Sequence, residues 1–107
     1  ILPNLIAAAG RNDDRGYPGS ALFEVGPVFI TQKPDGQQIH ASGIRIGPAG
    51  PRHWTGRDTS RNVDAYDAKS DVLAVLGACG LPPGSGQVVA EAPPYFHPGR
   101  SGSIKLG

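Results

Sequence analysis

The sequence predicts an α+β fold in which a mostly antiparallel sheet has flanking helices. Apolar residues recur at helical spacing near the start of the chain and again in its second half. Two short strand-like runs follow each of these segments. The 16 glycines and 11 prolines lie between the segments as turn residues and form no repeat. The expected order is helix, strand, strand, helix, strand, strand.

Residues 2–12 are predicted to form the first helix. Its apolar residues have the spacing of one helical face, and Pro3 suits the first turn, where its missing N–H has no partner in the helix. The face consists of Leu2, Leu5, Ile6 and Ala9.

A hairpin is expected next, with strands at residues 22–29 and 39–46 joined by the turn Lys33-Pro34-Asp35-Gly36. Pro27 removes a ladder donor, which favours an edge or bulge position. The apolar phase changes around Gly43, and this predicts a β-bulge. One face of the first strand presents Phe23, Val25 and Phe29.

Residues 48–62 are expected to form a long irregular connection anchored by Trp54. Loops longer than about 12 to 15 residues usually carry function, disorder or an interface. Residues 1–107 are interpreted as a single fragment of one domain. The chain begins without Met, so we expect it to come from a longer protein.

The second helix is predicted between Asp64 and Leu81, because both of its ends carry signals. Asp64 can cap the N-terminus with Asp67 three residues on, and Gly80 can end the helix in a left-handed conformation. The expected apolar face consists of Ala68, Val72, Val75, Leu76 and Cys79. Two short strands are then predicted at residues 87–91 and 103–106.

Composition excludes several classes of protein. Hydrophobic residues make up 38% of the chain and charged residues 18%, which is too apolar for a disordered tail. The net charge of +1 gives no strong field to concentrate phosphates. Cys79 is the only cysteine, and a single thiol that is expected to be buried fits a reducing cytoplasm. We therefore expect a cytoplasmic globular domain that is no autonomous nucleic-acid binder.

No catalytic, cofactor-binding or metal-binding residue is predicted. His40, His53 and His97 lack the spacing of zinc motifs. The run Gly99-Arg100-Ser101-Gly102-Ser103 departs from a nucleophile elbow, because Ser103 stands where the second glycine belongs. A small independent enzyme is disfavoured.

The segment Tyr95-Phe96-His97-Pro98-Gly99-Arg100-Ser101 combines aromatic and cationic residues with rigid turn residues. Tyr95, His97 and Arg100 are candidates for an interface or an anion contact. In the alternative interpretation, Tyr95 and Phe96 pack into the core while Arg100 pairs with a carboxylate.

Several blocks together resemble the beta subunit of bacterial phenylalanine-tRNA ligase. They are Leu2-Pro3-Asn4-Leu5 with Arg11-Asn12, residues 22–29, residues 63–72 and residues 95–102. The resemblance implies a cytosolic heterotetramer of two alpha and two beta subunits that joins phenylalanine to tRNA(Phe) using ATP and magnesium. It also implies that the alpha subunit carries the chemistry. The beta subunit would carry a module that is folded like a class II synthetase and helps to build the alpha/beta interface.

One departure from the family pattern decides what this segment is expected to do. A working class II second motif has an Arg two positions before its Glu, which holds the ATP α-phosphate. If Glu24 matches that Glu, Leu22 stands in the Arg position and offers neither charge nor bidentate donors. The resemblance thus implies a non-catalytic assembly module that binds no cofactor itself.

The alternative is an RNA-binding module without enzymatic activity that contacts tRNA. Its affinity would fall steeply with salt if its arginines neutralise phosphates. The arginines in question are Arg52, Arg57, Arg61 and Arg100.

Overall fold

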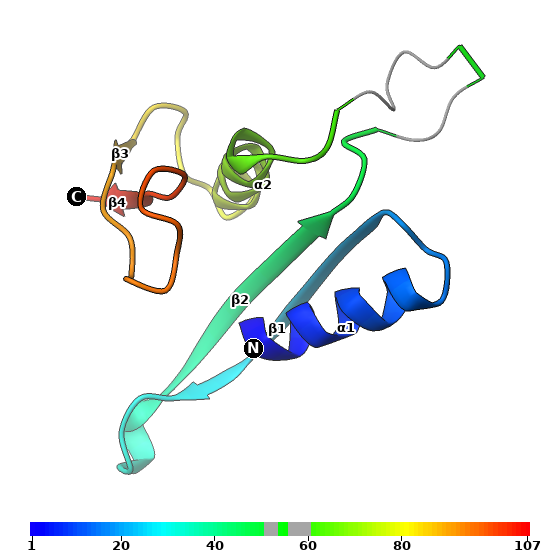
Figure 1. Cartoon of the computed structure of the whole chain (residues 1–107). Coiled ribbons are helices and arrows are strands. Elements are labelled where there is room, and N and C mark those ends of the chain that lie inside the picture. Colours follow the sequence, from blue (N-terminus) through cyan, green and yellow to red (C-terminus); the bar gives the residue numbers. More distant parts are fainter. Residues whose placement is uncertain (51–53, 56–60) are drawn as a thin grey trace. The chain divides into compact units, whose positions relative to one another are not determined.

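The computed structural model describes residues 1–50, 54–55 and 61–107 (Figure 1). These residues form two compact units, Ile1–Val63 and Asp64–Gly107. The predicted α+β class and the order of elements are confirmed. The elements are α1 (Leu2–Asp14), β1 (Ser20–Phe29), the 3₁₀ helix η1 (Pro34–Gly36), β2 (Gln37–Ile46), α2 (Ala65–Ala78), β3 (Gly86–Val89) and β4 (Ser103–Leu106).

Helix α1 packs on the β1–β2 hairpin and forms the core of the first unit (Figure 1). Pro3 lies in the first turn, as predicted. Leu5 and Ala9, one helical turn apart, are the buried hydrophobic residues in the described ranges. A core that buries so few apolar side chains provides little hydrophobic stabilisation, since burying a large one contributes about 1.5 to 3 kcal/mol.

The hairpin is a regular antiparallel ladder that runs from Ser20↔Ile46 to Phe29↔Gln37. The predicted bulge at Gly43 is wrong, because Gly43 pairs directly with Phe23 and the register continues unbroken. The apolar phase seemed to change because both faces of β2 carry isoleucine. Ile44 and Ile46 are half-buried, whereas Ile39 lies on the other face.

Pro27 lies inside β1 opposite Ile39 without breaking the ladder. The Ile30 N–H donates to the Gly36 carbonyl at 2.9 Å, so this pair is hydrogen-bonded. Hydrogen-bonded pairs alternate with non-bonded ones along an antiparallel ladder, which makes Pro27 a non-bonded position. Its missing N–H therefore belongs to the outer edge of β1, as the prediction of an edge position requires.

The predicted connection 48–62 is closed at its base by backbone pairing. Pro48 bridges Asn62, and the Val63 N–H donates to the Gly47 carbonyl at 3.0 Å. Residues 51–53 and 56–60 lie outside the described residues. Trp54 is 91% exposed, and its role as an anchor of this connection stays a prediction.

Helix α2 has the two ends that the sequence predicts. The Asp64 Oδ1 accepts from the N–H groups of Tyr66 and Asp67 at 2.8 and 3.3 Å, while the Asp67 Oδ2 accepts from the Asp64 N–H at 2.9 Å. At the other end, Gly80 has φ of 92° and the Leu81 N–H donates to the Leu76 carbonyl at 3.0 Å.

The apolar face predicted for α2 is not covered. No residue of α2 is buried within its unit, and Val72 and Val75 are exposed. Cys79 is also exposed, so the expectation of a buried thiol is wrong. Capping and glycine termination depend on neighbouring residues only, whereas burial depends on which other segments pack against the helix.

Replacing Asp64 with alanine is expected to destabilise α2 by about 1 kcal/mol, because two backbone N–H groups lose their acceptor. Amide hydrogen exchange of Tyr66 and Asp67 should accelerate correspondingly. Lys69→Ala, in the same helix but away from the cap, is the control and should leave their exchange almost unchanged. Equal acceleration in both variants would contradict the capping role.

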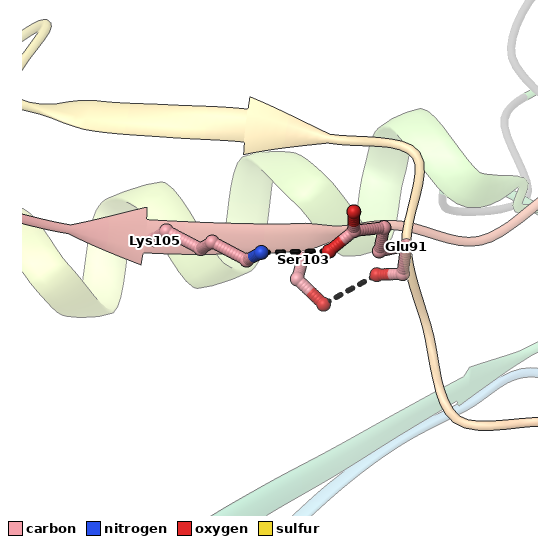
Figure 2. A network of polar contacts seen from close by, with 3 residues as sticks. All are labelled: Glu91, Ser103 and Lys105. Carbon is pink, nitrogen blue, oxygen red and sulfur yellow. Dashed lines mark hydrogen bonds and ion pairs between the residues drawn. The ribbon is translucent and has the colours of Figure 1, made fainter.

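Strands β3 and β4 form a second antiparallel pair, from Gly86↔Leu106 to Val89↔Ser103. In the ranges that the structure describes, the four strands thus make two separate two-stranded sheets where the sequence predicted one sheet. Figure 2 shows how β4 is tied to the segment that follows β3. The Lys105 Nζ lies 2.6 Å from the Glu91 Oε2, and the Ser103 hydroxyl donates to the Glu91 carbonyl at 2.5 Å.

Candidate functional site

The segment between β3 and β4 holds the three residues that the sequence singles out. Tyr95, His97 and Arg100 are all exposed, and Tyr95 is 75% exposed. The Tyr95 and Phe96 rings lie 4.8 Å apart at 43°, and the Phe96 N–H donates to the Pro93 carbonyl at 3.0 Å. The alternative that Tyr95 packs into the core is therefore wrong. The structure gives Arg100 no ion pair with another described residue.

His97 is the centre of the hydrogen bonds in this segment. Its ring Nδ1 accepts from the Gly99 N–H at 3.1 Å. Its carbonyl oxygen accepts from the Arg100 N–H at 3.1 Å and from the Ser101 hydroxyl at 2.6 Å. The segment is thus a defined turn that holds two exposed side chains, those of His97 and Arg100, three residues apart.

The hydroxyls of the incomplete nucleophile elbow have structural roles. Ser101 donates to the His97 carbonyl, and Ser103 donates to the Glu91 carbonyl. A nucleophilic serine would instead donate to a general base. In this structure both hydroxyls donate to backbone carbonyls.

The remaining histidines and acidic residues assemble no metal site in the described ranges, where no three His, Cys, Asp or Glu side chains come together. His40 lies 3.4 Å from the Gln38 side chain, and His53 falls outside the described residues.

None of the helices in the described ranges is long and apolar enough to span a membrane.

A second candidate surface, which the sequence did not predict as a site, lies on the β1–β2 hairpin. We call it the hairpin face. It is the face of the ladder opposite the half-buried residues, and directly paired positions such as Pro27 and Ile39 share it. Its large apolar side chains are Phe23, Val25, Phe29 and Ile39, which are 81%, 59%, 73% and 69% exposed. The turn at residues 33–36 fixes the pairing register, and side chains alternate between the two faces of a strand. These two signals together would have predicted this surface from the sequence.

Two of the four arginines proposed for RNA binding, Arg61 and Arg100, are among the described residues. Arg61 Nη1 donates to the Asn62 carbonyl at 3.2 Å in the first unit, whereas Arg100 belongs to the second unit. Arg52 and Arg57 lie outside the described residues.

Comparison of the sequence with models of known protein families identifies the family of this chain. The model described as "Phenylalanyl tRNA synthetase beta chain CLM domain" matches residues 1–107. The chain belongs to this family. The resemblance inferred from the sequence is therefore confirmed.

Individual relatives of this CLM domain agree with that result. Phenylalanine–tRNA ligase beta subunits from Paramagnetospirillum magneticum and Rhodospirillum rubrum are 55% and 56% identical over 107 residues. The corresponding subunit from Bartonella henselae is 52% identical over 112 residues. All three matches cover the whole chain, which spans only 13% to 14% of the length of these relatives.

In this CLM domain Leu22 is half-buried and pairs with Ile44. Both residues lie on the packed side of the β1–β2 ladder, away from the hairpin face. Glu24, two residues on, shares that side of the ladder and is exposed. Leu22 is thus a packing residue, and no cation stands at its position.

Proposed function

We propose that this chain is a non-catalytic structural and assembly module of the beta subunit of phenylalanine-tRNA ligase. In the proposed ligase, two alpha and two beta subunits assemble in the cytoplasm. The alpha subunits use ATP and magnesium to join phenylalanine to tRNA(Phe). Membership of the beta-chain family and the names of its relatives support this assignment.

The fold of the module is proposed to be part of a class II synthetase-like domain, with residues 1–107 as a single fragment of it. The antiparallel hairpin with a helix on one side supports this proposal, as does the order of elements. Within such a domain, the two small sheets would be extended by strands from the remainder of the longer protein.

The observation that carries the assembly role is the exposed hairpin face. Phe23 and Phe29 present their rings to solvent on a two-stranded sheet whose other face is packed. Contiguous exposed apolar surface of this kind marks an interaction site. Covering each large side chain would contribute about 1.5 to 3 kcal/mol to assembly. Among the described residues, four large apolar side chains are thus exposed on this face, while the buried hydrophobic residues are Leu5 and Ala9.

The donor set at the hairpin supports the proposed absence of catalysis. Holding an ATP phosphate requires cationic, bidentate donors, and Leu22 offers only a hydrocarbon side chain at the matching position. Glu24 without that arginine would repel the phosphate. Leu22 and Glu24 do not fit an ATP phosphate, so no step of adenylate formation is assigned to them.

The loop with Tyr95, His97 and Arg100 is proposed as a second contact surface of the module. An exposed tyrosine and arginine are the residue types that dominate interface energetics. Two observations support this proposal. The residues lie in a hydrogen-bonded turn, and their side chains are exposed within their own unit.

Replacing Glu24 with alanine in the full-length beta subunit tests the non-catalytic assignment. Phenylalanine-dependent pyrophosphate exchange by the alpha/beta complex is expected to stay within about twofold, because Glu24 holds no nucleotide. A loss of about a hundredfold or more with the complex intact would mean that this hairpin binds ATP.

A further inference from the structure

The strongest unexplained feature is the convergence of three hydrogen bonds on one exposed residue. Gly99 N–H donates to the His97 ring, and Arg100 and Ser101 both donate to the His97 carbonyl. Exposed histidine rings have no need of such a backbone donor, because water can serve both ring nitrogens. The hydrogen bond to the ring therefore restrains the backbone of the loop at Gly99.

We infer that His97 is the positioning residue of the β3–β4 loop and that it acts through its ring Nδ1, the acceptor of the Gly99 N–H. A backbone N–H is always a donor, so the Nδ1 atom that receives the Gly99 N–H must be unprotonated.

The neighbours of His97 explain why the loop uses a ring acceptor. Pro98 has a fixed φ and no N–H, whereas Gly99 has the widest backbone freedom of any residue. The ring bond spans Pro98 and holds Gly99 on the far side of it. The His97 Cε1 also lies 3.6 Å from where a Gly99 side chain would begin, so the ring packs directly over the glycine.

Arg100 is fixed by the same arrangement. Its N–H bonds to the His97 carbonyl, so a ring that restrains Gly99 also sets the direction in which the chain enters Arg100. His97 acts through Arg100 and Gly99 and is a positioning residue. An effect of His97 on partner binding rests on the proposed function. Its effect on the geometry of the loop is independent of that function.

Two substitutions separate the ring acceptor from the rest of the side chain. Asparagine places an acceptor oxygen close to the position of Nδ1, and glutamine places its acceptor one bond further out. We expect His97→Asn to keep the bond from Gly99 and His97→Gln to lose it. His97→Ala, which has no acceptor, is the reference for complete loss.

The test is amide hydrogen exchange, at short labelling times, of the peptide that contains Gly99, Arg100 and Ser101, in the full-length beta subunit bound to its alpha partner. Exchange at Gly99 is expected to rise roughly three- to tenfold in His97→Gln and His97→Ala, the equivalent of one lost hydrogen bond. In His97→Asn it should stay within about twofold of the native rate.

Equal exchange in the asparagine and glutamine variants, or unchanged exchange in all three, would overturn the positioning role. Retention of the alpha subunit is scored separately on the same samples. If the exchange pattern is as expected and alpha binding is unaffected in every variant, the positioning role stands and this loop is no interface.

Discussion

Replacing Gly47 with alanine is expected to destabilise the hairpin unit by about 2 to 5 kcal/mol. Gly47 follows β2 with φ of 83°, where a side chain costs about 1 to 2 kcal/mol. A Cβ atom there would also meet the Pro18 carbonyl oxygen at 1.9 Å and the Gly19 Cα at 3.1 Å. These are backbone atoms of the segment entering β1, so relief requires the two ends of the hairpin to separate.

Gly16→Ala is the matched control for Gly47→Ala. Gly16 has the same φ of 83° and belongs to the same unit, but nothing lies within 4 Å of its missing Cβ. It should therefore show only the conformational cost of about 1 to 2 kcal/mol. The free energy of opening, from hydrogen exchange of the β1 and β2 amides, measures both effects. Equal destabilisation by the two variants would rule out the close approach at Gly47.

The second large effect is expected on assembly. Phe23→Ser combined with Phe29→Ser removes the two most exposed rings of the hairpin face while leaving the packed face intact. Under the proposed function, the assembled ligase covers these rings. Losing about 1.5 to 3 kcal/mol at each ring should weaken the alpha/beta complex at least about a hundredfold. Co-purification of the alpha subunit with the full-length beta subunit measures the loss.

Tyr17→Ser controls for the mere removal of an exposed aromatic residue. Tyr17 is 64% exposed in the same unit, but it lies outside the hairpin face. Its substitution should leave the complex intact. If the double phenylalanine variant recovers as much alpha subunit as Tyr17→Ser does, the hairpin face is not part of the assembly.

Local chemistry explains which parts of the fold the sequence could predict. The Asp64 cap, the Gly80 terminus and the turn at residues 33–36 depend on neighbours within a few residues, and all three are present. The prediction at Gly43 failed because isoleucines on both faces of β2 imitate a change of phase. Which of the two faces is covered depends on α1, a segment distant in sequence.

The candidate site could be predicted only in part. Rigid residues around Tyr95 and Arg100 drew attention to the loop, and the structure leaves both side chains exposed. The role of His97 depends on the direction of its ring, which no spacing rule supplies. The absence of an arginine at Leu22, by contrast, is a property of residue identity and can be read directly from the sequence.

Under the proposed function, this chain contributes an assembly interface to the ligase and no catalytic residue. The most direct test is the rate of phenylalanine-dependent pyrophosphate exchange per assembled alpha/beta complex in the Phe23→Ser and Phe29→Ser single variants. We predict that total exchange falls with the amount of complex, while the rate per complex stays within about twofold of the native value. A rate per complex that falls about a hundredfold while the amount of complex is unchanged would contradict the claim.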